Sequence, residues 1–292
     1  MDAEANFQTA RRQITDAAAA GADLAVLPEF HLTSWTPKRE GFFAACFASS
    51  VYLAKYQDLA RELRIHIVPG TICEPYTAEG RLATTEADIQ AAGSAIEWRN
   101  MAYFISAGTG DIAGAYQKKN LWHSERGHLA ASTQEEPHAA FDTPFLHADG
   151  VTPVRAGFLI CWDLAFPEAF RALIADGADI VIIPSWWYPL DADSANPRER
   201  EGAALNRDAE RVFVETATIL RAFEGNVAVV FSNAGGSSGV TMPVLGEIVR
   251  CGVGEEMKVA EIDLDVLRVA EGMYKIREDL ASVGWHYGYE KK

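Results

Sequence analysis

The sequence contains two similar stretches that indicate how the chain folds: Gly21-Ala-Asp-Leu-Ala-Val-Leu-Pro28 and Gly177-Ala-Asp-Ile-Val-Ile-Ile-Pro184. Each follows a segment with apolar residues at helical spacing, and its glycine suits the left-handed position that ends a helix. Each continues as a short apolar run, typical of a strand buried on both faces, and stops at a proline, which cannot continue a central strand. The stretches predict two helix–strand units, although a chance likeness between Ala- and Val-rich segments would look the same.

Hydrophobic patterning predicts further elements around these two units. Helices and strands alternate early and paired strands dominate later, which predicts an α/β fold with two packed sheets and helices outside. No linker rich in proline, serine and glycine divides the chain, so residues 1–292 are expected to form a single domain. Expected strands are 65–69, 101–107, 112–117, 154–160, 226–232, 239–242, 246–250 and 258–262; expected helices are 41–63, 167–176, 198–224 and 264–271; 84–92 is ambiguous; 123–150 and 185–200 are expected loops, long enough to be functional.

Composition narrows the class of protein and its partners. With 292 residues, 49% of them hydrophobic and 23% charged, the chain can bury a full core without a metal or disulfide. A net charge of −15 argues against nucleic acid or an anionic membrane as a partner. The four cysteines form no CxxC pair, and the sequence shows neither a signal-peptide pattern nor an apolar run of 18 residues. A cytoplasmic location is therefore expected.

Three residues that follow predicted strands could carry chemistry. Cys161 ends an apolar run and precedes a predicted helix, so it lies at a strand–turn–helix junction. Glu29 follows the first of the two similar stretches, and Lys118 follows the predicted strand 112–117. Each residue alone has an ordinary structural explanation, as a buried cysteine, a loop glutamate or a solvated lysine.

Together the three residues favour an acyl-transfer site. In open α/β sheets the ligand crevice lies off the carboxyl ends of the strands, where all three are expected to converge. A thiol is a good nucleophile only as a thiolate, so Cys161 needs a base or a nearby cation. Partial burial of Glu29 would suit it to proton transfer, and Lys118 would stabilise an oxyanion and lower the pKa of the thiol.

These blocks, in this order, resemble the nitrilase superfamily of carbon–nitrogen hydrolases. Leu-Pro-Glu at 27–29 resembles the base motif of that family. The stretch 116–121 resembles its lysine motif and selects Lys118 over Lys119, and 157–168 resembles its nucleophile motif. Weaker similarity extends the resemblance over nearly the whole chain, at 221–226, 243–247 and 260–264.

The resemblance implies a four-layer α-β-β-α sandwich, often paired into a homodimer or higher homo-oligomer. It also implies a triad of Glu29, Lys118 and Cys161 that works without a metal or organic cofactor. Glu125, seven residues after the lysine, matches a second family glutamate and is expected to be catalytic. The backbone N–H of Trp162 is expected to hold the oxyanion together with Lys118.

Two features depart from the family pattern. Family members usually begin with a strand of the type Val-Ala-Val-Val-Gln, whereas this sequence starts almost at its first helix, so the first strand is expected to be missing. The lysine motif often has histidine where this chain has Asn120. Neither departure touches the triad. Asp163 and Arg171 are expected to be structural residues around the helix that follows Cys161.

The expected function is hydrolysis of a non-peptide carbon–nitrogen bond in a small amide or carbamoyl amine through a cysteine thioester. Cys-Trp-Asp at 161–163 resembles the amidase branches, because true nitrilases more often carry Glu after Trp. A nitrilase, an inactive binding module and a Cys–His hydrolase remain as alternatives, although no histidine motif is tied to Cys161. Trp186 and Trp187 are expected to line the substrate pocket, or else to be core or interface aromatics.

Overall fold

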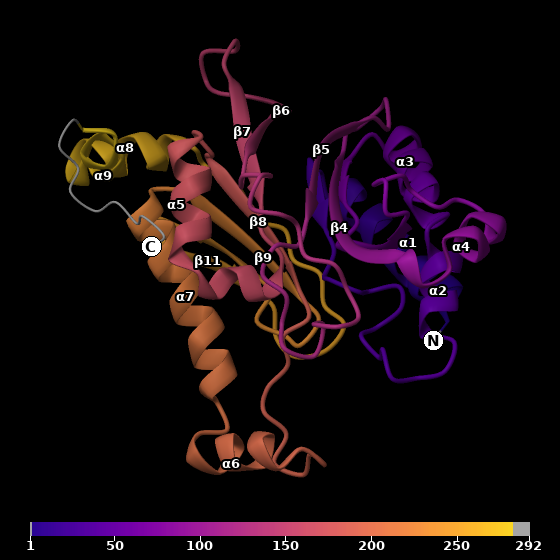
Figure 1. The fold of residues 1–292 in the computed structure, drawn as a ribbon. Helices are drawn as coiled ribbons and strands as arrows, with labels where there is room; N and C mark the ends of the chain where they lie inside the picture. The colour runs from indigo at the N-terminus through magenta and orange to yellow at the C-terminus, as the bar shows by residue number, and fades with distance from the viewer. Residues whose placement is uncertain (1, 283–292) are drawn as a thin grey trace.

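The computed structural model describes residues 2–282, which form two β-sheets packed face to face with helices on both outer sides (Figure 1). The helices are α1 (Ala3–Ala19), α2 (Phe42–Ser49), α3 (Tyr52–Leu63), α4 (Glu86–Ala92), α5 (Pro167–Ala175), α6 (Pro197–Leu205), α7 (Ala209–Gly225), α8 (Asp265–Tyr274) and α9 (Ile276–Ala281), with 3₁₀ turns η1 (Gly93–Ala95) and η2 (Cys161–Ala165). The strands are β1 (Leu24–Val26), β2 (His66–Val68), β3 (Thr71–Tyr76), β4 (Glu97–Ile105), β5 (Ile112–Gln117), β6 (Ala140–Leu146), β7 (Pro153–Phe158), β8 (Ile180–Ser185), β9 (Ala228–Asn233), β10 (Gly239–Met242) and β11 (Gly246–Arg250).

The first sheet has the order β1-β2-β4-β3, with β5 also paired to β4. The second sheet has the order β11-β10-β9-β8-β7-β6. Its strands β7, β8 and β9 are parallel neighbours, so their carboxyl ends meet at one edge. Lys118 follows β5 of the first sheet, and Cys161 lies three residues beyond the end of β7 in the second.

Three apolar clusters separate the four layers. One packs α1 and α3 against β1 and β2, and a second fills the space between the two sheets. The third packs α5 and α7 against β8 and β9. The expected α-β-β-α sandwich is therefore confirmed.

The two similar stretches form the two helix–strand units that they predict. α1 ends before Gly21 and leads into β1, and α5 ends before Gly177 and leads into β8. Both glycines have a left-handed backbone, with φ of 82° at Gly21 and 85° at Gly177. Most of the other predicted strands and helices are present, with ends shifted by a few residues.

Two long predicted helices are interrupted. The expected helix 41–63 divides into α2 and α3, because Ser49 and Ser50 turn their hydroxyls back onto the carbonyls of Ala45 and Phe47. The expected helix 198–224 divides into α6 and α7 at 206–208, where Asn206 has an extended backbone. The ambiguous segment 84–92 contains α4, which begins with a capping box between Thr85 and Asp88.

Two strands lie where none was expected. β3 was not predicted, and β6 lies within the expected loop 123–150. Each contains a proline, Pro75 in β3 and Pro144 in β6, which argues against a central strand. Both strands lie at sheet edges, where a residue without an N–H donor is tolerated. α9 was also not predicted.

The expected strand 258–262 is wrong. This segment has no regular secondary structure, and no strand of the described residues pairs with it. It lines a groove of about 1090 Å³, which α1 and β1 also line. In the described part of the chain β1 pairs only with β2, no strand precedes α1, and no helix is long and apolar enough to cross a membrane.

Candidate active site

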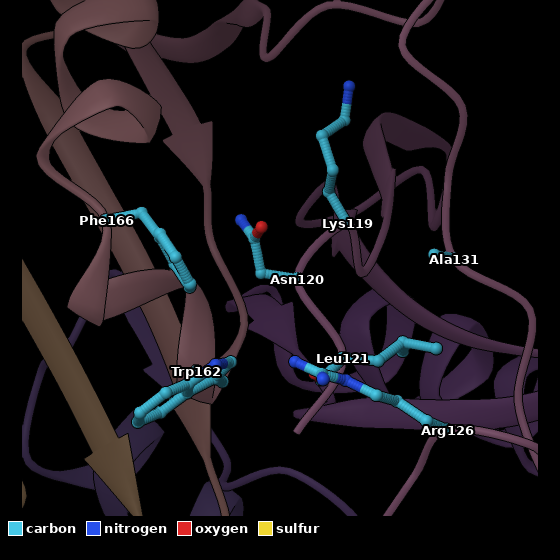
Figure 2. Close-up of a pocket in the computed structure, with 7 residues that line it drawn as sticks. All are labelled: Lys119, Asn120, Leu121, Arg126, Ala131, Trp162 and Phe166. Carbon is cyan, nitrogen blue, oxygen red and sulfur yellow. The ribbon is translucent and has the colours of Figure 1, made fainter. Parts of the chain in front are cut away.

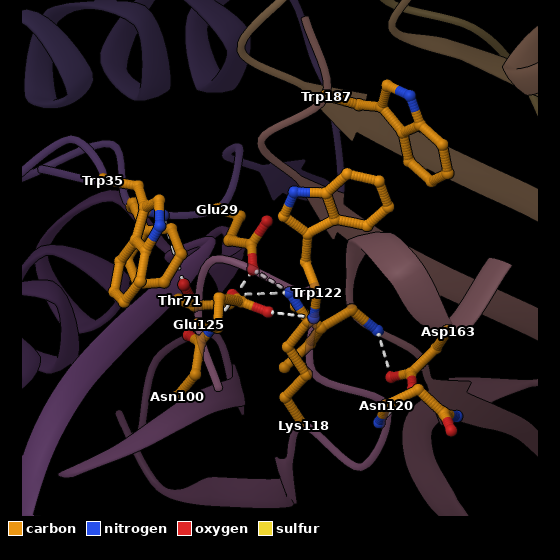
Figure 3. Close-up of polar contacts among 12 residues, drawn as sticks. Glu29, Trp35, Thr71, Asn100, Lys118, Asn120, Trp122, Glu125, Asp163 and Trp187 are labelled. Carbon is orange, nitrogen blue, oxygen red and sulfur yellow. Dashed lines mark hydrogen bonds and ion pairs between the residues drawn. The ribbon is translucent and has the colours of Figure 1, made fainter. Parts of the chain in front are cut away.

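Lys118 lies at the centre of a buried charge cluster, shown in Figure 3. Its side chain is fully buried, and its Nζ lies 2.8 Å from Glu29 Oε1 and 2.8 Å from Glu125 Oε1. Burial alone would lower the pKa of this lysine, but the two carboxylates outweigh burial and raise it. Lys118 is therefore a fixed cation held by two carboxylates.

Glu29 has one occupied and one free carboxylate oxygen. Its Oε1 accepts hydrogen bonds from Lys118 and from the Asn100 side-chain amide at 2.8 Å. Its Oε2 is buried and accepts no hydrogen bond from the described residues. A buried carboxylate oxygen without a donor is well suited to take a proton from a neighbouring group.

Glu125 is the second carboxylate on the lysine, as its spacing predicts. Its Oε2 accepts a hydrogen bond of 2.6 Å from the backbone N–H of Trp122, which fixes the carboxylate in the turn after Lys118. Burial raises the pKa of Glu125 to about 7, although Lys118 opposes the shift. The cluster thus contains a carboxyl group that titrates near neutral pH.

Cys161 lies at a strained turn beside this cluster. It is a non-glycine residue with φ of 47°, between β7 and the helix α5, and its side chain is buried. Strained backbone of this kind is often found at functional sites, including strand–turn–helix nucleophile turns. Burial and the charge of Glu29 raise the pKa of the Cys161 thiol, whereas Lys118 lowers it. Because burial disfavours the thiolate, this nucleophile calls for a base that removes its proton.

Asp163 fastens the nucleophile turn to the lysine loop. Its Oδ2 accepts hydrogen bonds from the Ile160 backbone N–H at 2.9 Å and the Tyr116 hydroxyl at 2.8 Å. Its Oδ1 accepts from the backbone and side chain of Asn120 at 2.9 and 2.8 Å. This is the structural role expected of Asp163. Asn120 takes part in it by donating both hydrogen bonds to Oδ1. Arg171 joins α5 to α7 through Glu224.

Two of the three predicted tryptophans lie together near Cys161. The ring centroids of Trp162 and Trp187 are 5.4 Å apart, and Trp122 lies 4.4 Å from Trp162 on the other side. Trp187 is also anchored through its backbone, which exchanges two hydrogen bonds of 2.7 Å with the side chain of Asn233. Trp186 contacts Tyr188 with ring centroids 5.1 Å apart, lines the groove beside β1, and packs against the apolar cluster that contains Phe30 and Leu121.

A smaller cavity of about 250 Å³ borders the site on the other side of Trp162 (Figure 2). Its lining residues do not include Glu29, Lys118 or Cys161. They come from the loop between β5 and β6 and from the turn after Cys161: Lys119, Asn120, Leu121, Arg126, Ala131, Trp162 and Phe166.

Comparison with known proteins identifies the family of the chain. The model of the family described as carbon-nitrogen hydrolase matches residues 1–270. The chain belongs to the carbon–nitrogen hydrolase family. The predicted membership of the nitrilase superfamily is thereby confirmed.

Among curated members of the family, an (R)-stereoselective amidase from a Pseudomonas species is 32% identical over 168 residues, which cover 58% of this chain and 54% of the relative. A deaminated glutathione amidase from Bos taurus is 28% identical, covering 63% of this chain and 52% of the relative. The chain thus spans about half the length of these two relatives. A nitrilase from Pyrococcus abyssi is 26% identical over 92% of this chain and 87% of its own.

Solved structures show the same fold. A carbon–nitrogen hydrolase from Helicobacter pylori aligns with a TM-score of 0.75 at 18% identity, covering 95% of this chain and 90% of that one. The NitFhit protein of Caenorhabditis elegans aligns with a TM-score of 0.69 at 23% identity, covering 95% of this chain and 61% of its own.

Within this carbon–nitrogen hydrolase, the sequence alone did not reveal Asn100. Its side chain is fully buried and donates to Glu29, while its backbone carbonyl accepts a hydrogen bond of 2.9 Å from the N–H of Lys118. One residue therefore positions both the base and the lysine. The available signal was an asparagine immediately before the predicted strand 101–107, which actually begins at Glu97.

Proposed function

We propose that this chain hydrolyses a non-peptide carbon–nitrogen bond in a small amide or carbamoyl amine through a thioester on Cys161. The observation that carries the proposal is the fully buried Lys118 ammonium, bound by Glu29 and Glu125 beside a cysteine at a strained turn. Placing three charged side chains out of water is costly, and a site of this kind is common where proton transfer and oxyanion stabilisation are required.

In the first half of the reaction, Glu29 Oε2 takes the thiol proton, and the Cys161 sulfur forms a bond to the substrate carbonyl carbon. The carbonyl π electrons move onto oxygen, which the Lys118 ammonium and the Trp162 backbone N–H stabilise. The oxyanion then collapses and breaks the carbon–nitrogen bond. Ammonia or an amine leaves with the proton that Glu29 holds, and the acyl group remains on sulfur as a thioester.

In the second half, Glu29 removes a proton from water, and the hydroxide oxygen attacks the thioester carbon. Collapse of this second oxyanion breaks the carbon–sulfur bond and releases the acid. The proton on Glu29 returns to the sulfur. Glu125 holds Lys118 in place throughout and orients the substrate, so that the cation faces the oxygen that becomes negative.

An amide or carbamoyl amine is the proposed substrate class, and a nitrile is the alternative. Two of the relatives above are named amidases, and the Cys-Trp-Asp sequence favours the same branches. The nitrilase from Pyrococcus abyssi aligns over more of this chain, which favours testing nitriles as well. The aromatic rings of Trp162 and Trp187 would contact the apolar part of a small substrate.

The test is ammonia release from a panel of short amides, carbamoyl amines and nitriles. We expect turnover of at least one amide or carbamoyl amine, and its loss in Cys161→Ala. Turnover of nitriles alone would replace the amidase assignment with a nitrilase. A Cys161→Ala protein with full turnover would refute the thioester route. No release from any substrate, together with a Cys161 that does not react with iodoacetamide, would favour a binding module on this scaffold.

We also propose that the protein forms a homodimer or higher homo-oligomer through α7. This helix exposes several large apolar side chains, among them Ile219, Leu220 and Phe223, the last in contact with the ring of Tyr274. Contiguous exposed apolar side chains often mark protein interfaces. Sedimentation should give a mass above that of one chain, and Leu220→Glu should reduce it; a monomeric parent protein would refute the proposal.

A further inference from the structure

Ser185 is the last residue of β8 and lies beside the nucleophile. β7 and β8 are parallel, and Phe158 pairs with Ile182. The backbone N–H of Leu159 continues this ladder with a hydrogen bond of 3.1 Å to the Ile182 carbonyl. β8 also packs against the turn η2, which begins at Cys161, so the end of β8 at Ser185 lies near the nucleophile turn. The serine hydroxyl accordingly lies beside the sulfur and lowers the pKa of the thiol, against the effect of burial.

The surroundings of Ser185 make a hydroxyl unexpected there. The rest of β8 is largely apolar: Val181 and Ile183 belong to the cluster beneath α5 and α7, and Ile182 belongs to the cluster between the sheets, which also contains Cys161. The whole residue is buried. Its Oγ has no hydrogen-bond partner among the described residues, whereas its backbone carbonyl is bonded to the Ala234 N–H at 3.1 Å. Buried hydroxyl groups are normally bonded, so a free one needs an explanation.

The explanation offered by the geometry is that the hydroxyl bonds the sulfur only when the sulfur is charged. A neutral thiol is a weak acceptor, which agrees with an unbonded Oγ in the resting site. Once Glu29 removes the proton, the thiolate becomes a strong acceptor, and hydrogen bonds to charged groups are the stronger ones. The other titratable groups that act on this sulfur are Glu29, Lys118 and Glu125.

We propose that the Ser185 hydroxyl donates a hydrogen bond to the Cys161 thiolate and holds that thiolate in position for attack. This role rests on the proposed function, since it takes Cys161 as the nucleophile. It assigns Ser185 a contact with the reacting sulfur. Ser185 ends a strand of the second sheet, whereas Glu29 and Lys118 follow strands of the first. Interactions present only in the charged state favour the reaction over the resting state.

The experiment measures the rate of Cys161 alkylation by iodoacetamide from pH 6 to pH 10, with peptide mapping to separate Cys161 from Cys46, Cys73 and Cys251. We expect Ser185→Ala to shift the alkylation profile to higher pH and to slow the reaction at neutral pH by about tenfold or more, from the loss of one hydrogen bond to a charged group. Ser185→Thr, which keeps the hydroxyl, should restore the parent profile. Ser49→Ala is the matched control, because Ser49 is a buried serine whose hydroxyl bonds a helix carbonyl.

An unchanged profile in Ser185→Ala would overturn the inference. So would equal slowing in the Ala and Thr variants while both melt like the parent, because shape and not the hydroxyl would then matter. If Ser185→Thr does not fold, the Ala profile against Ser49→Ala decides. Failure of the proposed function looks different: Cys161 would be alkylated with a normal Ser185 dependence, yet no amide would be turned over.

Discussion

The two helix–strand units of this carbon–nitrogen hydrolase have similar sequences but different surroundings. β1, of the first unit, has three residues, pairs on one side only and borders a groove. β8, of the second unit, has six residues, all buried, and pairs with β7 and β9. The residue after the first unit's proline is Glu29, and the residue after the second's is Ser185. The comparison suggests that the first unit supplies charge to the site, and the second supplies rigidity.

The largest expected effect is chemical and lies at the end of the first unit. Glu29→Gln keeps the shape of the side chain but removes the proton acceptor, so we expect kcat/KM for an amide to fall by about 10²–10⁴-fold. Initial rates of ammonia release would measure it. Glu201→Gln, on the exposed surface of α6, should leave the rate unchanged. A Glu29→Gln protein within tenfold of the parent would remove Glu29 as the base and break the assignment of chemistry to the first unit.

The next effect concerns the charge cluster around that base. In the folded protein the pKa of Glu125 is raised to about 7 from an ordinary value of 4.5. Between those two pH values the folded state holds a proton that the unfolded chain has lost, so this group's contribution to the free energy of unfolding falls as pH rises. The full difference is about 3 kcal/mol, at about 1.4 kcal/mol for each unit of pKa.

Urea denaturation of the parent and of Glu125→Gln at pH 5, 6, 7 and 8 would measure this contribution. The free energy of unfolding of the parent minus that of Glu125→Gln should fall as pH rises to about pH 7 and then level off. Glu97→Gln, at an exposed carboxyl on β4, should give a difference that does not vary in this way. If the difference for Glu125→Gln did not vary between pH 5 and pH 8, the Glu125 carboxyl would be ionised over that whole range. The cluster would then take up no proton in it.

The sequence alone could predict the features that depend on local chemistry, in both units. Short continuous apolar runs, glycine after a helix and polar residues after strands depend on local chemistry, and they predicted both units and the positions of Glu29, Lys118 and Cys161. The predictions that failed depended on neighbours far away in the chain. Nothing local shows that β3 and β6 lie at edges where Pro75 and Pro144 are tolerated, or that no described strand pairs with 258–262.

The site shows the same limit. Glu125 was predicted from the family resemblance, because it lies seven residues after Lys118 as the second family glutamate does. Asn100 could not be predicted, because it donates to Glu29 across a sheet, from β4. The role proposed for Ser185 likewise depends on how β8 packs beside the turn that begins at Cys161. The register of strands far apart in sequence is fixed by packing and is not written in either strand alone.

The smallest expected effect tests the rigidity of the two strands with one matched substitution. Val181 in β8 is fully buried and paired on both sides, whereas Val26 in β1 is partly exposed and pairs only with Val68. We expect Val181→Ala to lower the free energy of unfolding by about 2–3 kcal/mol, from lost burial and the cavity that remains. Val26→Ala should cost about 1 kcal/mol or less, because its side chain already borders the groove. Urea denaturation at pH 7 would measure both. Equal losses would mean that β1 is as tightly packed as β8, and that the difference between the units lies in their chemistry alone.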